Sequence, residues 1–324
     1  MTRDTTSRDA TLGQQTRALT RALAQAPDQQ IARAVALLDA LPERGAADAL
    51  IAPLRRQLGT MGIPRRMNFG RLLFLPLDPV IRDASAGRWA DGAAVPRTAL
   101  PPLIAAVRNA LPDLAAATAA ELRADPDIAS AACTLGPPLW AAAPAPLRAL
   151  ATASGLPGWT ESGLPPASLA PIATGVAAVL ELFEQLRGPE AALGDALART
   201  ATTMPDAWPL VVAVALARAP DPATAAMLAM ARAERGSPAL HRGLEQGLAT
   251  ATEILEREAQ APIRAAAAAT ARAARIIEAV APRAGPARRA ALAAFAARIA
   301  AACHARFAGE MEGGLLAPLR SLAP

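Results

Sequence analysis

The sequence predicts an all-α protein, built as an antiparallel helical bundle or an irregular α-solenoid of alanine-rich helices. Alanine accounts for 89 of the 324 residues, whereas aromatic residues make up only 3%. Alanine is the best helix former, and its small side chain lets neighbouring helices pack closely. Residues that favour strands are scarce, and tyrosine is absent. A hydrophobic fraction of 53% with 19% charged residues excludes a disordered chain, which needs low hydrophobicity and high net charge.

The N-terminal part is expected to form short helices joined by loops. Residues 1–10 read as a flexible polar tail, after which apolar residues recur at helical spacing until prolines interrupt them. An N-terminal helical subdomain is predicted over 11–133. Its helices are expected at 46–58, 98–111 and 112–124, the last with proline in its first turn, where the missing N–H does no harm.

A stretch rich in proline and glycine, 134–166, predicts a connection to a C-terminal helical subdomain over 167–324. The alternative is a set of short helices inside one continuous domain. Beyond this stretch, apolar spacing predicts seven helices, most of which open on proline or aspartate. These helices are expected at 167–187, 190–201, 205–219, 222–235, 238–260, 262–281 and 286–310.

Charge is segregated along the chain. All 33 basic residues are arginine, and five of them lie between Asp48 and Asp78 with no acidic residue among them. Eight more lie between Glu258 and Glu310, against Glu278 alone. These two windows carry +5 and +7, so the remainder carries −7, because the whole chain is +5. Clustered charge focuses an electric field, and the two windows therefore indicate contact with something anionic.

The missing residue types exclude several classes of enzyme. Without lysine there is no Walker A lysine, no Schiff-base chemistry and no Ser–Lys dyad. Cys133 and Cys303 stand alone, with no CxxC spacing, which favours a reducing cytoplasm over a disulfide framework. The polar N-terminus and the prolines within the longest uncharged runs predict neither a signal peptide nor a membrane span. The sequence therefore predicts a cytoplasmic location.

The first candidate binding segment is 65–81, which combines arginines with the apolar run 72–77. The segment could dock a protein partner or rest on anionic lipid. Its apolar side chains point in every direction around a helical wheel, which favours a third reading, a core segment with solvated arginines at its edge. The candidate binding residues here are Arg65, Arg66, Asn68, Phe69 and Arg71.

The second candidate lies in the C-terminal basic window. On the predicted helix 262–281, Arg264, Arg272 and Arg275 fall within about 80° of one another, opposite isoleucine and valine. The next predicted helix, 286–310, has one apolar side and one side of mostly alanine, which suggests a contact with another helix or a second subunit. The alternative is a solvated positive face with ordinary internal packing.

The sequence predicts no catalytic residue, no metal site and no cofactor. Two ExxE pairs, Glu181 with Glu184 and Glu253 with Glu256, could hold a metal only if their helices faced each other. The function predicted is a non-enzymatic adaptor or scaffold that binds a protein partner. The first alternative is arginine-mediated binding of nucleic-acid phosphate or an anionic lipid headgroup. The second alternative is a helical enzyme with a carboxylate-bound metal.

Overall fold

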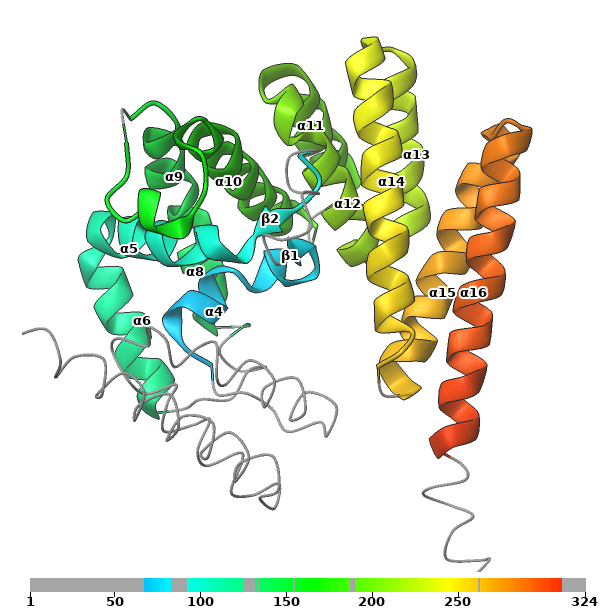
Figure 1. Cartoon of the computed structure of the whole chain (residues 1–324), viewed down its shortest axis with the longest axis horizontal. Helices are drawn as coiled ribbons and strands as arrows, with labels where there is room; N and C mark the ends of the chain where they lie inside the picture. The colour runs from blue at the N-terminus through cyan, green and yellow to red at the C-terminus, as the bar shows by residue number, and fades with distance from the viewer. Residues whose placement is uncertain are drawn as a thin grey trace, which may run out of the picture. The chain divides into compact units, whose positions relative to one another are not determined.

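In the computed structural model, the described residues are 67–82, 92–124, 132, 134–153, 155–186, 190–261 and 263–310. They contain 12 α-helices and two strands of two residues each, which pair in parallel. The all-α prediction is therefore confirmed (Figure 1).

The first half of the described part consists of short elements. They are α4 (Phe69–Leu73), η1 (Leu75–Val80), β1 (Ile81–Arg82), β2 (Val95–Pro96), η4 (Arg97–Ala99), α5 (Leu100–Ala110), α6 (Pro112–Ala124), α8 (Gly136–Ala142), α9 (Pro144–Ala151), η5 (Thr160–Ser162) and η6 (Pro166–Ser168), where η marks a 3-10 helix.

The second half consists of longer helices joined by short turns. They are α10 (Leu169–Gln185), α11 (Glu190–Thr203), η7 (Pro205–Ala207), α12 (Trp208–Arg218), α13 (Pro222–Glu234), α14 (Pro238–Glu258), α15 (Ile263–Val280), η8 (Ala281–Arg283) and α16 (Pro286–Glu310). The predicted starts at 222 and 238 match those of α13 and α14, because both coincide with capping residues. Asp221 and Ser237 each accept a hydrogen bond from a backbone N–H of the helix that follows them, and proline comes next in both cases.

The long helices pack against their second neighbours along the chain as well as their first. Thus α10, α12, α14 and α16 form one series of contacts, and α11, α13 and α15 form another (Figure 1). The choice between a bundle and a solenoid stays a prediction.

Helix α12 lies at the centre of the described core. Its residues from Trp208 to Ala217 are all buried, and its closest partner is α14. Two glycines on α14 allow this approach. A Cβ at Gly243 would lie 2.7 Å from the Trp208 ring, and one at Gly247 would lie 2.7 Å from the Val212 side chain and 2.8 Å from the Pro209 carbonyl oxygen. Side chains at these positions would push the two helices apart.

The apolar run 72–77 is part of the core. Leu72, Leu73 and Leu77 are fully buried, and Phe74 is 3% exposed. Helix α4 packs on α5, α6 and α8, while η1 packs on α10, α12 and α14. The sequence left three interpretations open for 65–81. For the residues of this apolar run, the structure agrees with the interpretation as a core segment.

The predicted connection 134–166 contains α8, α9 and the 3-10 helix η5, and it ends where η6 begins. Both α8 and α9 pack on α10, and α8 also contacts α4. The indole Nε1–H of Trp140 donates to the Leu72 carbonyl oxygen at 2.9 Å, and its ring meets that of Phe183 edge-on at 5.0 Å. The division into two subdomains stays a prediction, but this stretch has partners on both sides of it in the sequence.

Replacing Trp140 with phenylalanine tests how much this link contributes. The substitution keeps an aromatic ring but removes the donor, which leaves the buried Leu72 carbonyl without the indole. We expect the free energy of unfolding to fall by about 1–3 kcal/mol, measured by urea denaturation. A control is Trp159→Phe, whose indole donates to the Pro165 carbonyl in a part-buried turn six residues away. If Trp140→Phe lowers the free energy of unfolding no more than Trp159→Phe does, the bond from Trp140 to Leu72 is not an important link.

One helix of the described part, Pro166–Gln185, is long and apolar enough to cross a membrane by length and composition. In the structure, 61% of its most apolar window is buried inside the protein. Its contacts with α8, α9, α11 and α12 account for its composition as that of a core helix.

Candidate functional site

The structure gives the residues predicted at 65–71 local roles. Asn68 caps α4, and its side-chain oxygen accepts from the Arg71 backbone N–H at 2.9 Å. Phe69 is 3% exposed, and the Arg108 guanidinium stacks over its ring at 5.3 Å. Arg71 is half-buried in the last turn of α4. Arg65 and Arg66 lie outside the described residues.

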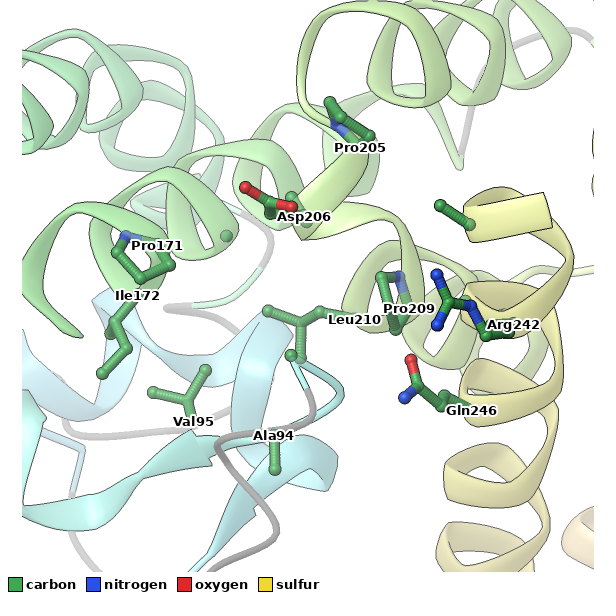
Figure 2. Close-up of a pocket in the computed structure, with 15 residues that line it drawn as sticks. Ala94, Val95, Pro171, Ile172, Pro205, Asp206, Pro209, Leu210, Arg242 and Gln246 are labelled. Atoms are coloured by element: carbon green, nitrogen blue, oxygen red, sulfur yellow. The ribbon is translucent and has the colours of Figure 1, made fainter. Parts of the chain in front are cut away.

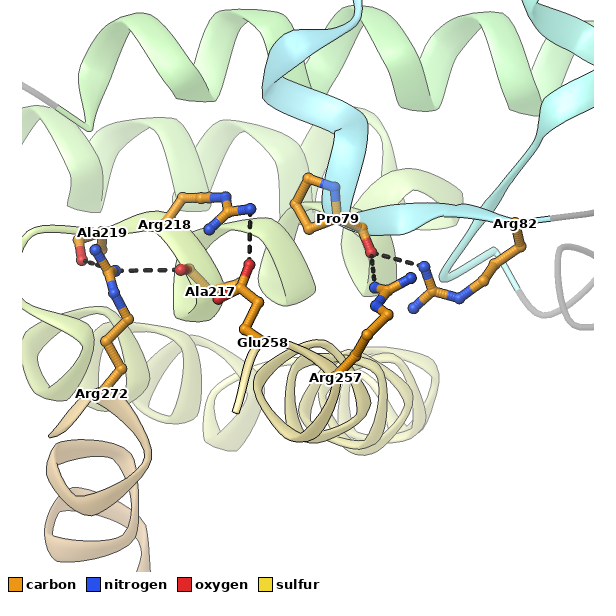
Figure 3. A network of polar contacts seen from close by, with 8 residues as sticks. All are labelled: Pro79, Arg82, Ala217, Arg218, Ala219, Arg257, Glu258 and Arg272. Atoms are coloured by element: carbon orange, nitrogen blue, oxygen red, sulfur yellow. Dashed lines mark hydrogen bonds and ion pairs between the residues drawn. The ribbon is translucent and has the colours of Figure 1, made fainter. Parts of the chain in front are cut away.

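Two of the three arginines predicted as a stripe on α15 bind other helices of the same chain. The Arg272 guanidinium donates to the carbonyl oxygens of Ala217 and Ala219, at 3.1 and 2.9 Å, where α12 ends (Figure 3). Arg275 forms an exposed ion pair with Asp221 at 3.0 Å. For Arg264 the structure describes the helix but not the side chain. The stripe therefore joins α15 to α12 and to the start of α13.

The pKa values of two of these groups follow from their surroundings. Burial, and then the nearby charge of Arg218, lower the pKa of the Arg272 guanidinium, while Glu258 opposes that shift. Arginine titrates so far above neutral pH that Arg272 is charged there. The Thr224 hydroxyl, the Ala223 backbone N–H and Arg275 lower the pKa of Asp221 against the effect of burial. Asp221 therefore acts as a charged N-cap for α13.

Another arginine contact joins the end of α14 to η1. The Pro79 carbonyl oxygen accepts from Arg82 and from Arg257, each at 2.7 Å, and the second bond joins residues 178 positions apart (Figure 3). Beside them, Arg218 pairs with Glu258 at 2.8 Å. Positively charged groups bind the free carbonyls at helix ends favourably. These arginines therefore stabilise contacts within the chain.

The glutamates of the two ExxE pairs do not gather into a metal site. Glu181 pairs with Arg148, and Glu256 pairs with Arg298 at 2.7 Å. Within the ranges that the structure describes, no group of three or more His, Cys, Asp or Glu side chains is placed to hold a metal ion. The carboxylate-metal alternative draws no support from these residues.

The described part has an open-sided pocket of about 370 Å³ at the start of α12. Four segments line it: the residues around β2, the first turns of α10, the turn η7 with the start of α12, and one face of α14 (Figure 2). Most of its lining is glycine, alanine or proline, and larger apolar side chains form its floor. Those floor residues are Val95, Ile172 and Leu210, all buried.

Small residues create this hollow. Gly175 on α10 lies close to Leu210, since a Cβ there would lie 3.2 Å from the Leu210 side chain, a tight contact. Gly92 adopts a φ of +73°, a conformation that side chains with a Cβ rarely take, and it lies against the Asp206 backbone. The walls are thus set by backbone packing, and the pocket is pre-formed.

Three polar side chains stand at the edge of the pocket. Arg242 and Gln246 are one turn apart on α14 and project toward Pro209, while Asp206 lies on the other side of Pro209 in this view (Figure 2). All three are exposed. Among the described residues, the Arg242 guanidinium has no ion-pair or hydrogen-bond partner, unlike Arg257, Arg272 and Arg275. An arginine beside an apolar floor is therefore available to a ligand.

Sequence reasoning did not select these pocket residues. One part of the pocket could have been predicted from sequence, because helical spacing places four of its residues on one face of a helix. They are Ala239, Arg242, Gly243 and Gln246. The other three walls come from segments as much as 154 residues earlier, and nothing in the spacing shows that they meet this face.

The chain matches no family model, no curated protein and no solved structure.

Proposed function

We propose that the protein is a non-enzymatic adaptor that binds a protein partner, and that the pocket at the start of α12 receives a short apolar stretch of that partner. The observation that carries this proposal is the pocket itself, with its buried apolar floor and its available cation at Arg242. Concave, mostly apolar sites with a few polar groups at their edges are the usual form of a binding site.

This proposal keeps the adaptor role but moves the binding site. The arginines first considered as contacts, Arg272 and Arg275, have partners within the chain, and Phe69 is buried. Those contacts favour a role in holding helices together over binding phosphate or lipid. Arg242 lies on a pre-formed pocket instead, so a partner could dock with little rearrangement of the backbone.

Site-specific crosslinking tests this function. A photo-reactive benzophenone amino acid at Ala239, an exposed position at the pocket edge, should give a defined protein adduct after irradiation in the native cells. The control carries the same group at Ala249, which is also exposed on α14 but does not line the pocket. An adduct at 239 and none at 249 supports the adaptor proposal. Equal adducts at both positions, or none at 239, would overturn it.

A further inference from the structure

We infer that the pocket recognises the C-terminal end of a protein chain, whose terminal carboxylate binds Arg242 and Gln246 while an apolar terminal side chain fills the floor. This inference rests on the proposed function and adds the chemistry of the bound segment. It follows from three features of the pocket: the number of its charges, the arrangement of its donors and the nature of its floor.

The number of cations in the pocket lining indicates a ligand with a single negative group. Arg242 is the one cation in the pocket lining. Guanidinium groups bind carboxylates in a two-pronged geometry, and phosphate sites more often combine several cations or backbone donors. One available arginine therefore matches a carboxylate with one charge better than a phosphate group.

The donors on α14 suit that carboxylate. Arg242 and Gln246 are four residues apart, so their side chains share one face of the helix and reach the same edge of the pocket (Figure 2). The guanidinium offers two parallel N–H donors and the amide offers a further one. A bond between a guanidinium and a carboxylate is charge-assisted, and it is therefore stronger than a hydrogen bond between neutral groups.

The remaining polar group distinguishes a peptide from a simple fatty acid. Asp206 stands away from the α14 pair on the other side of Pro209, and carboxylate oxygens accept hydrogen bonds (Figure 2). A peptide brings backbone N–H donors to that position, whereas a fatty acid has none. Val95, Ile172 and Leu210 form a floor for an aliphatic terminal side chain.

The direct test is a titration of the 15N-labelled full-length chain with N-acetyl-leucyl-leucine, its C-terminal amide and octanoate. The readouts are the NMR shifts of the Gln246 side-chain amide and the Trp208 indole N–H, next to the pocket. The Trp159 indole N–H, which bonds to Pro165, is the internal reference. We expect the free acid to bind about tenfold more tightly than the amide, because the amide removes the charge that Arg242 contacts.

Two variants identify the cation. Arg242→Ala should bring the affinity of the acid down to that of the amide. Arg235→Ala removes an exposed arginine outside the pocket and should leave the tenfold preference intact. Equal binding of acid and amide by the unmodified protein, a preference that survives Arg242→Ala, or octanoate binding as tightly as the peptide acid would each overturn the inference.

The crosslinking experiment tests this inference separately from the proposed adaptor function. If the adduct at position 239 maps to the last residues of the partner, both stand. If it maps to an internal segment, the adaptor proposal stands and the C-terminal assignment falls.

Discussion

Replacing Gly247 with valine is expected to lower the free energy of unfolding by about 3 kcal/mol. A Cβ at this position would lie 2.7 Å from Val212 and 2.8 Å from the Pro209 carbonyl oxygen. The Pro209 oxygen belongs to the backbone of α12, so it cannot rotate away as a flexible side chain could. The larger side chain therefore forces α14 away from the most buried helix of the described part.

A second glycine supplies the matched control. Gly194 lies within α11, where an added Cβ would meet Leu228 at an ordinary 3.7 Å. There, alanine should raise stability by about 0.5–1 kcal/mol, since glycine is the poorer helix former. Gly247→Ala should lower stability despite the same gain in propensity. Urea denaturation of both alanine variants decides the matter, and equal shifts in the same direction would contradict close packing at Gly247.

Removal of the Arg272 side chain should cost about 2–3 kcal/mol of stability. Its guanidinium donates to two carbonyl oxygens at the end of α12, and Arg272→Ala leaves both without that donor in a part-buried position.

Arg275→Ala is the comparison, because it removes the same residue type three positions along the same helix. Its ion pair with Asp221 is exposed, with side-chain exposures of 57% and 46%. Exposed pairs contribute about 1 kcal/mol or less, so this variant should unfold close to the unmodified protein. Thermal and urea unfolding of the two variants give the comparison. Loss of stability at Arg275 as large as that at Arg272 would show that the carbonyl contacts are not what matters.

The helices could be predicted from sequence because their boundaries depend on local chemistry. The predicted ranges 112–124 and 286–310 match α6 and α16. Prolines and capping residues determine where such helices begin, and these act within one turn of the chain. The start of α12 was missed by three residues, because Pro205 opens a 3-10 turn before the α-helix rather than the helix itself.

The roles of the arginines could not be read in the same way. A helical wheel places Arg272 and Arg275 on one face, but it does not show what that face meets. Their partners, Ala217, Ala219 and Asp221, lie more than 50 residues earlier. Two of those partners are backbone carbonyls. Because every residue has one, the sequence does not show which carbonyl accepts such a bond. A count of charges therefore does not show that Arg272 and Arg275 have partners within the chain.

The long-range bond between Arg257 and Pro79 has a consequence for the order in which the protein is made. A ribosome releases residues 69–80 long before it releases α14, which supplies part of the wall that covers η1. The loop between Pro79 and Arg257 must also close, at a cost in chain entropy, before the contacts between its ends can stabilise it. A nascent chain that ends before α14 thus leaves η1 without part of its native cover, and during that interval of translation more of its apolar surface is exposed to chaperones.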